Sequence, residues 1–527
     1  MGLFLNPKPH GFWESLNSQV YVDKSGLIAK TNALLRSRQK FMCVSRPRRF
    51  GKSMAMDMLS AYYAYGQDSS ALFEGSEISG DETYKTHLNQ YNVLKINMQN
   101  FLSMTGNIDE LLELLQSELL EELQEAYGTK KTRLILAMGD IYAKTGRGFV
   151  ILIDEWDCLF REYSEDKVSQ RKYLDFLRMW LKDQDYVALA YMTGILPIKK
   201  YGTHSALNMF MEYSMTNPKN LAPYFGFTGD EVRKLCEQYH MNFEECKAWY
   251  DGYDLSEKTG EVTIPHSMYN PKAVVEAMMS HNFGPYWNQT ETYEALKVYI
   301  QLNIDGLKDA VVQMLTGAAV PVDITSFEND MVTFTGADDV LTLLIHLGYL
   351  SYHAESRTVT VPNKEVTQVY TTSIKVMKGW NEVARSLEAS RKLLESLWNM
   401  DGDAVAAGID QAHAEISILK YNDENSLSCC INLAFYFAKE YYNIVRELPA
   451  GKGFADVCLV PRPLHMDKPA AIIELKWDKD AQGAIAQIKN KQYVNALKDY
   501  SGNLLLAGIN YDRETKKHSC VIEKVDI

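Results

Sequence analysis

One short loop in the sequence carries residue types that could bind a phosphate chain. An apolar run at 41–44 precedes it, and Gly51, Lys52 and Ser53 open a stretch with apolar residues at helical spacing. A strand, a loop and a helix in this order point backbone N–H groups and the positive end of the helix dipole at the loop. Lys52 would then lie against the β- and γ-phosphates of a nucleotide, and the Ser53 hydroxyl would bind Mg²⁺.

The same loop is rich in arginine. Such loops usually have a glycine five residues before Gly51, but Arg46 stands there instead. We predict that Arg46 and Arg49 bind the nucleotide together with Gly51, Lys52 and Ser53. The alternative is a basic loop followed by an ordinary helix start, because short motifs also occur by chance.

Two carboxylates follow a second apolar run. Residues 149–153 are all apolar, and Asp154 and Glu155 come directly after them. This pattern is typical of a central parallel strand whose carboxyl end meets the phosphate loop. We predict that Asp154 holds Mg²⁺ through water and that Glu155 orients and deprotonates the attacking water. The alternative is a buried strand that ends in a charged turn.

A third apolar run, at 186–192, ends in Thr193 and Gly194. Thr193 stands where a side chain would sense the γ-phosphate, so we include it among the nucleotide-binding residues. A lone threonine at a strand end is more often only a cap, and that alternative stays open.

A second set of charged residues lies near the carboxyl end of the chain. Asp456 is in one apolar, strand-like segment, and Glu474 and Lys476 are in the next. Because side chains alternate along a strand, Glu474 and Lys476 share a face with Ile472, and Asp456 shares one with Cys458. Charges on such faces are costly unless a metal ion or a partner satisfies them. We predict that Asp456 and Glu474 hold Mg²⁺ and that Lys476 positions or activates a water for phosphodiester hydrolysis.

Flanking helices could complete this second site. Glu424 begins a preceding helix and could supply a third carboxylate to the metal. In the following helix Gln487 and Lys491 share a face, whereas Tyr493 does not. The alternative is an exposed hairpin with ordinary salt bridges.

The elements that position the first site alternate between strands and helices. We expect a short strand and turn at 20–31, a strand at 91–97 and a pair of amphipathic helices within 108–143. This alternation predicts a doubly wound α/β domain over residues 1–215.

The middle of the chain no longer alternates regularly between strands and helices. In the expected lid, residues 216–365, Thr228 and Glu231 form a capping box, and the aromatic residues of 249–253 are expected in a core. The order helix, strand, helix and hairpin over 306–364 resembles a winged helix, and its acidic residues favour a lid over a DNA-binding surface. A helical connector over about 372–414 then opens the last domain, 366–527.

Length and composition agree with a multidomain cytoplasmic protein. The chain has 527 residues, and its net charge of −13 argues against a chain-wide basic surface for nucleic acid. Its eight cysteines form no CxxC pair, which fits reduced thiols. We expect no membrane span and no signal peptide, and Asn6 departs from the myristoylation pattern.

Together these motifs resemble the bacterial and archaeal family of predicted AAA-ATPase-like proteins with a C-terminal PD-(D/E)XK nuclease domain. The resemblance covers nearly the whole chain and rests on Arg46–Ser53, Ile153–Glu155, Thr193–Ile198, Trp249–Tyr253 and the set of Asp456 with Glu474–Lys476. An arginine-bearing phosphate loop is the pattern of that family. The resemblance implies an AAA-like P-loop fold that binds ATP, followed by a restriction-endonuclease-like α/β domain.

Three functions follow from this resemblance. The first is an ATPase whose nucleotide state controls a Mg²⁺-dependent nuclease acting on nucleic acid, with DNA the expected substrate. The second is a regulatory or signalling NTPase that uses an inactive nuclease fold as a binding module. The third is a nucleotide-binding switch that barely turns over. A homo-oligomer is compatible with all three, and no arginine finger can be assigned from one chain.

Overall fold

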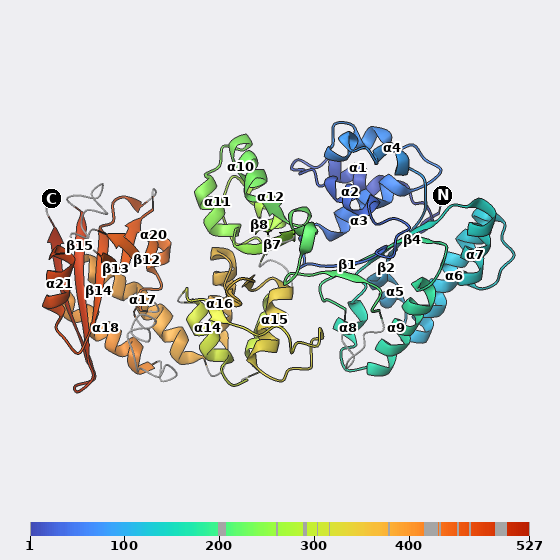
Figure 1. Ribbon diagram of the computed structural model, residues 1–527. Coiled ribbons are helices and arrows are strands. Elements are labelled where there is room, and N and C mark those ends of the chain that lie inside the picture. The colour runs from blue at the N-terminus through green and yellow to red at the C-terminus, as the bar shows by residue number, and fades with distance from the viewer. Residues whose placement is uncertain are drawn as a thin grey trace. The chain divides into compact units, whose positions relative to one another are not determined.

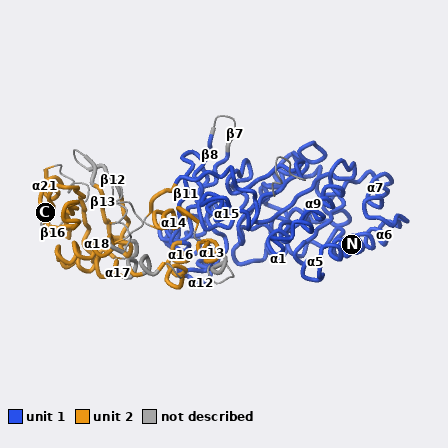
Figure 2. Tube along the Cα trace, turned by 90° about the horizontal axis from the view of Figure 1, so that it is seen from below, with its two compact units in different colours: residues 1–292, 321–366 blue, residues 293–320, 367–527 orange. Residues whose placement is uncertain are grey.

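The computed structural model (Figure 1) describes residues 2–198, 207–259, 262–287, 292–302, 304–315, 317–377, 380–415, 431, 434–450, 453–462, 465–490 and 503–525. The chain divides into two compact units (Figure 2). The first comprises Met1–Thr292 and Pro321–Val366, and the second comprises Tyr293–Val320 and Thr367–Ile527. The expected domain boundaries at 215 and 365 stay predictions.

A five-stranded parallel sheet organises the first unit. Its strands run in the order β2-β3-β4-β1-β5. Their bounds are β1 Phe41–Ser45, β2 Asn92–Asn97, β3 Phe149–Asp154, β4 Val187–Gly194 and β5 Met211–Tyr213. Every residue of β1, β3 and β4 is buried, as the unbroken apolar runs predict.

Two separate layers of helices cover the faces of this sheet (Figure 1). Met42 and Val44 pack into a core with α1–α4, whereas Phe41 and Cys43 pack into a core with α5–α9. The helices are α1 His10–Leu16, α2 Gly26–Asn32, α3 Lys52–Tyr63, α4 Tyr84–His87, α5 Met98–Met104, α6 Ile108–Tyr127, α7 Leu134–Thr145, α8 Cys158–Glu162 and α9 Lys167–Leu181. The doubly wound α/β prediction is therefore confirmed.

The prediction of a strand at the start of 20–31 is wrong. The chain there forms a turn and then α2, Gly26–Asn32. Asp23 accepts hydrogen bonds from the backbone N–H groups of Ser25 and Glu77, which fixes a turn instead of an extended strand. Leu27 and Ile28 of α2 are fully buried.

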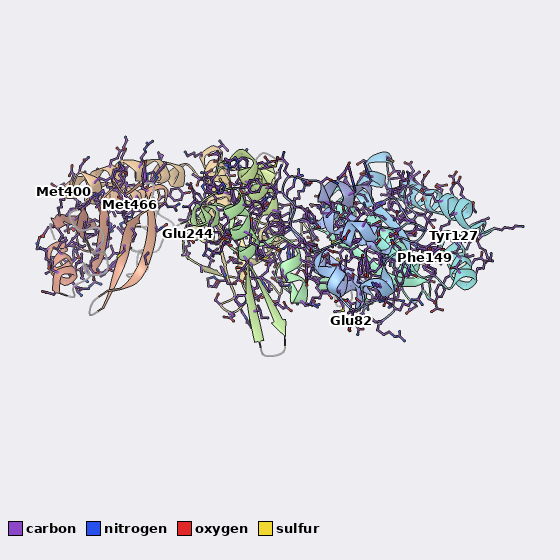
Figure 3. The ribbon with its side chains drawn as sticks, turned by 90° about the horizontal axis from the view of Figure 1, so that it is seen from above. Glu82, Tyr127, Phe149, Glu244, Met400 and Met466 are labelled. Carbon is purple, nitrogen blue, oxygen red and sulfur yellow. The ribbon has the colours of Figure 1, made fainter. Side chains whose placement is uncertain are left out.

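The middle of the first unit, the expected lid, combines helices with small sheets. It contains α10 Gly229–Gln238, α11 Phe243–Tyr250, α12 Pro271–Ser280 and a sheet in the order β6-β8-β7, made of Phe227–Thr228, Val262–Tyr269 and Tyr253–Thr259. The predicted capping box of Thr228 and Glu231 begins α10. Strands β7 and β8 project away from these helices (Figure 3).

The winged-helix-like elements are present, with one shorter than expected. They are α14 Leu307–Leu315, β9 Val320–Pro321, α15 Ala337–Leu347 and the hairpin of β10 Ser351–His353 and β11 Thr358–Thr360. The strand expected between the two helices has only the two residues of β9, and α13 Thr292–Ile300 precedes this group.

The second unit ends in a mixed sheet ordered β12-β13-β14-β15-β16. Strands β14 and β15 pair in parallel and the other neighbours are antiparallel. Their bounds are β12 Tyr442–Ala450, β13 Gly453–Pro461, β14 Ala470–Trp477, β15 Leu504–Asp512 and β16 Lys517–Val525. The helices are α16 Lys364–Val376, α17 Asn381–Trp398, α18 Gly402–Glu415, α20 Ala438–Tyr441 and α21 Ala481–Asn490. Among the described helices of the chain, none is both long enough and apolar enough to cross a bilayer.

Candidate functional site

The phosphate-loop prediction places Lys52 at the start of α3, directly after β1 and its loop. Gly51 caps this helix with φ of 88°, a conformation that side chains disfavour. Lys52 is only 5% exposed, and its Nζ donates to the carbonyl oxygens of Arg46 and Pro47, each at 2.9 Å. Burial lowers the pKa of Lys52, against the opposing effect of the carboxylates of Glu155 and Asp154.

The predicted residues Ser53, Asp154 and Thr193 meet at the carboxyl ends of β3 and β4, with Asp154 hydrogen-bonded to the other two. The Ser53 hydroxyl donates to Asp154 Oδ2 at 2.8 Å, and the Thr193 hydroxyl donates to Asp154 Oδ1 at 2.5 Å. Asp154 is 5% exposed. Hydroxyl and carboxylate oxygens suit a hard cation such as Mg²⁺. The residues present therefore fit the predicted metal, and Thr193 contacts the carboxylate instead of serving only as a strand cap.

Glu155 is held by a residue that the sequence reasoning missed. Its backbone has φ of 51°, and its carboxylate contacts the guanidinium of Arg161 in α8. Burial raises the pKa of Glu155, while the charges of Lys52 and Arg161 act in the opposite direction. The fully buried Asp157 also faces Arg161, with Nε and Oδ1 3.5 Å apart. The spacing of Asp157 and Arg161, four residues apart, was a signal for this pair.

The two arginines predicted to bind nucleotide differ in position. Arg46 is fully buried, and its Nη1 donates to the carbonyl oxygens of Ser45 at 2.9 Å and Tyr213 at 2.8 Å. Its guanidinium also lies over the ring of Phe225, and burial lowers the pKa of Arg46 to about 10. Arg46 therefore connects β1 to β5 in the interior, which favours a structural role. Arg49 is exposed in the loop, where a phosphate could reach it.

The aromatic motif 249–253 is buried, as predicted, and it packs beside the predicted phosphate loop. Tyr253 is 1% exposed and packs against Phe50. A side-chain carbon added at Gly348 would meet Pro47 at 2.9 Å, so the lid backbone approaches the loop closely. No pattern in the sequence indicated which core these aromatic residues would join.

A partly buried ion pair joins the amino-terminal segment to the expected lid. Lys24 Nζ donates to Glu231 Oε2 at 2.6 Å and to the carbonyl oxygen of Pro223 at 2.8 Å. The same Glu231 carboxylate accepts the backbone N–H of Thr228 and completes the capping box. The turn at 20–25 is therefore fixed against the first helix of the lid.

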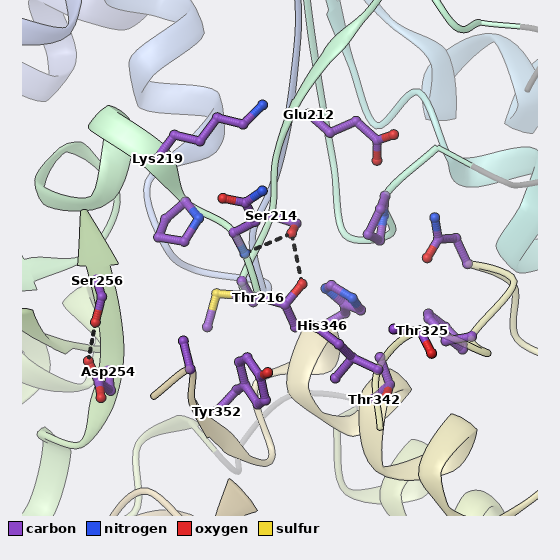
Figure 4. A pocket seen from close by; sticks show the side chains of 18 of the residues that line it. Glu212, Ser214, Thr216, Lys219, Asp254, Ser256, Thr325, Thr342, His346 and Tyr352 are labelled. Atoms are coloured by element: carbon purple, nitrogen blue, oxygen red, sulfur yellow. Dashed lines mark hydrogen bonds between the residues drawn. The ribbon is translucent and has the colours of Figure 1, made fainter. Parts of the chain in front are cut away.

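A cavity of about 880 Å³ lies elsewhere in the first unit (Figure 4). Glu212, Lys219, Asp254 and His346 contribute to its lining. Among the described residues, none of those predicted for the phosphate site lines it. The cavity is therefore separate from the predicted phosphate site.

The second site forms where β13 and β14 pair. Cys458 lies opposite Ile472, and both belong to one core cluster beneath α21, so the two strands present the same face to that helix. Burial and the nearby charges of Glu474 and Asp456 raise the pKa of Cys458 to about 12. Because side chains alternate along each strand, Asp456 and Glu474 lie on this same face.

Glu474 is the centre of this site. It is 2% exposed, Lys476 Nζ donates to its Oε1 at 3.0 Å, and the Gln487 amide of α21 contacts the same oxygen. The backbone N–H of Leu475 donates to Asp456 Oδ2 at 2.7 Å. Two carboxylates with an adjacent lysine fit the oxygen ligands and charge that Mg²⁺ requires.

Part of the predicted second site lies outside the described residues. Glu424, Lys491 and Tyr493 are in the ranges that the structure does not describe. Within the described ranges, no three His, Cys, Asp or Glu side chains gather as a metal site. Further ligands for a metal at Asp456 and Glu474 would have to come from elsewhere, such as Glu424, water or substrate.

Comparisons with known proteins match both halves of the chain. Residues 15–203 match the family model described as "Predicted AAA-ATPase", and residues 423–520 match the PD-(D/E)XK nuclease superfamily. An Azotobacter chroococcum mcd 1 protein, "Uncharacterized protein in vnfD 5'region", is 26% identical over 283 residues, or 52% of this chain. The chain covers 51% of that relative, about half its length.

A structural comparison adds little to these matches. The structure of the Aeropyrum Pernix ORC2 protein (ADPNP-ADP complexes) aligns over 71% of this chain and 99% of that chain, with 10% identity and a TM-score of 0.30. A TM-score this low does not establish a shared fold. The two family matches follow the order of the two large sheets along the sequence. The chain has the domain architecture of a predicted AAA-ATPase followed by a PD-(D/E)XK nuclease superfamily domain.

Proposed function

We propose that the first unit binds ATP with Mg²⁺ and hydrolyses it. The observation that carries this proposal is the convergence of Ser53, Asp154 and Thr193 beside Lys52, at the carboxyl ends of parallel strands. Gly51 and Lys52 begin α3, so its first N–H groups and its positive dipole end face the proposed phosphates.

Each residue has a role that its position supports. Lys52 would exchange the two loop carbonyls for phosphate oxygens, which relieves the cost of a buried ammonium group. Ser53 and Asp154 would hold Mg²⁺, which supplies positive charge to the phosphates when bound. Glu155 would orient a water and take its proton. Thr193, which donates to Asp154, would sense the γ-phosphate. Arg49 would contact phosphate from the exposed side of the loop.

We propose further that the second unit is a Mg²⁺-dependent nuclease controlled by the nucleotide state. Asp456 and Glu474 would hold the metal, with Glu424 as a third ligand, and the metal would supply Lewis acidity to the phosphodiester. Lys476 would position the attacking water. The expected substrate is nucleic acid, DNA in the first instance, and the protein could work as a homo-oligomer in the cytoplasm. The described cysteines are free thiols, which is consistent with that location.

Three variants test these assignments with purified full-length protein. Lys52→Ala should abolish binding of a fluorescent ATP analogue, and Glu155→Gln should keep binding but lose turnover. Asp456→Ala should abolish Mg²⁺-dependent DNA cleavage and leave ATP turnover intact. If cleavage by the Asp456→Ala protein equals that of the wild type, the nuclease assignment is wrong. If ATP and a non-hydrolysable analogue leave the cleavage rate unchanged, nucleotide control is wrong.

One observation favours the alternative of a regulatory NTPase with an inactive nuclease fold. The Glu474 carboxylate is already engaged by Lys476 and Gln487, so a metal must compete with both. A protein that hydrolyses ATP but leaves single- and double-stranded DNA and RNA intact with Mg²⁺ and Mn²⁺ would establish this alternative.

A further inference from the structure

At the first site, the Glu155 carboxylate that is proposed to act on water is held by the guanidinium of Arg161. We infer that Arg161 is a positioning residue that holds the Glu155 carboxylate in a resting position, and that turnover requires Arg161 to transfer fully to Asp157. This inference rests on the proposed function, because it concerns the residue proposed to activate water.

Arg161 lies between two carboxylates in a shielded position. Its Nη2 contacts Glu155 Oε2, and its Nε lies 3.5 Å from Asp157 Oδ1. The side chains of Arg161, Glu155 and Asp157 are 11%, 24% and 0% exposed, respectively. Water therefore screens these contacts only weakly. The guanidinium has two carboxylates within reach and can bind to either one.

The same three residues also allow the second arrangement, in which Arg161 binds Asp157 instead of Glu155. Among the described residues, neither Arg161 Nε nor Asp157 Oδ1 has a hydrogen-bond partner, although both atoms are buried. An unpaired buried polar atom is costly, and a small movement of Arg161 toward Asp157 would pair these two with each other. Asp157 is a fixed acceptor, because its Oδ2 already accepts the N–H groups of Ile195 at 2.9 Å and Leu196 at 2.8 Å.

Contact with Arg161 opposes the proposed action of Glu155. A carboxylate that accepts a charge-assisted hydrogen bond is a weaker acceptor for a water proton, and its orientation is fixed by the partner. The other charged groups acting on Glu155 are Lys52, Asp154 and Asp157. Of these, Lys52 is committed to its own loop, so Arg161 is the cation that holds the Glu155 carboxylate.

The nucleotide site is connected to the anchor of Arg161 through the end of β4. Thr193 donates to Asp154 and accepts the backbone N–H of Trp156 through its carbonyl oxygen at 3.0 Å. Two residues later, the backbone N–H groups at 195 and 196 fix Asp157. Binding of nucleotide and Mg²⁺ at Asp154 can therefore shift Asp157 through the short segment 193–196. This shift would favour the transfer of Arg161 to Asp157.

The test compares steady-state ATP turnover of the full-length protein with that of Arg161→Gln and Arg161→Lys. Arg161→Gln should raise kcat roughly tenfold, the effect of losing one charge-assisted hydrogen bond, and leave KM for ATP unchanged. Arg161→Lys keeps the cation and should stay near the wild-type kcat. Arg171→Gln, at an exposed position of α9, is the matched control and should change neither constant. A lower or unchanged kcat in Arg161→Gln would overturn the inference.

Asp157→Asn provides a second variant with the opposite expected sign. An asparagine oxygen can still accept the two backbone N–H groups, but it attracts Arg161 less strongly, so Arg161 should remain on Glu155 and kcat should fall. A raised or unchanged kcat would contradict the transfer. Binding of the fluorescent ATP analogue reports folding in each variant, so that a misfolded Arg161→Gln protein leaves Asp157→Asn to decide.

The outcomes also separate this inference from the proposed hydrolysis. If Glu155→Gln abolishes wild-type turnover while Arg161→Gln and Asp157→Asn leave kcat unchanged, only the role of Arg161 is wrong. If the wild type and Arg161→Gln both bind ATP but neither hydrolyses it, the proposed hydrolysis fails, and the resting-position inference fails with it.

Discussion

The ring of Tyr253 stands edge-on to the ring of Phe50, with centroids 5.1 Å apart and an interplanar angle of 88°. Phe50 belongs to the predicted phosphate loop, and Tyr253 is in the expected lid at the start of β7. The Tyr253 hydroxyl donates to the carbonyl oxygen of Gly348 at 2.9 Å, which fixes the ring from its other end. The conformation of the phosphate loop therefore depends on residues that lie about 200 positions later in the sequence.

We expect Tyr253→Ala to destabilise the first unit by about 4 kcal/mol, because it removes a buried ring and leaves a cavity behind the phosphate loop. Tyr253→Phe keeps the ring and should cost about 1 kcal/mol for the lost hydrogen bond. Urea unfolding measures both, and affinity for an ATP analogue should fall only in Tyr253→Ala. Tyr163→Ala, at a position 37% exposed, is the control. Equal losses of affinity in Tyr253→Ala and Tyr163→Ala would contradict the supporting role of Tyr253.

The ion pair of Lys24 and Glu231 should contribute more to stability than an exposed pair. Lys24→Met leaves the Glu231 carboxylate without its cation and should reduce the free energy of unfolding by roughly 2 kcal/mol. Lys144→Met breaks a pair with Asp140 in which the lysine side chain is 62% exposed, and it should cost less than about 1 kcal/mol. Chemical denaturation of the two variants gives the comparison, and a larger loss in Lys144→Met would refute it.

Glu365 should make the first unit less stable as pH rises. Burial raises its pKa from 4.5 to about 7, against the hydrogen bond that it accepts from the backbone N–H of Trp287. Between these pH values the unfolded chain has lost the proton and the folded chain retains it, so the unfolded state binds fewer protons and stability falls as pH increases. The full loss, roughly 3 kcal/mol, is reached above about pH 7.

The measurement is denaturant unfolding at pH 5 and pH 8. Glu365→Gln removes the ionisation, so its stability should decline less than that of the wild type over this interval. Glu355→Gln alters an exposed carboxyl group in the neighbouring hairpin and should behave as the wild type does. Identical pH dependence in the wild type and Glu365→Gln would rule out the shift.

Gln487 should be needed for the proposed nuclease activity because its amide contacts the Glu474 carboxylate. Groups that orient a metal ligand typically contribute 10- to 100-fold, so we expect Gln487→Ala to lower Mg²⁺-dependent cleavage by roughly that factor. Gln482→Ala is the matched control on the same helix, since Gln482 contacts the remote Glu523. Cleavage assays with plasmid DNA decide, and equal activity of the two variants would exclude this role.

The sequence alone was enough to predict the regular elements that hold both candidate sites. Unbroken apolar runs predicted the buried strands β1, β3 and β4, because a strand covered on both faces has no polar side to alternate with. Strand periodicity likewise predicted that Glu474 shares a face with Ile472. The three-residue spacing of Thr228 and Glu231 predicted their capping box, whose geometry is local.

Only the tertiary structure decided which side chains meet and which of the predicted residues face the site. Arg46 looks like a phosphate ligand in the sequence, but the pairing of β1 with β5 buries its guanidinium against the carbonyl oxygen of Tyr213. The contact of Arg161 with Glu155 and the packing of Tyr253 on Phe50 could not be predicted from the sequence either. Periodicity reports the face on which a residue lies, whereas its partner depends on strand order and on contacts between distant parts of the chain.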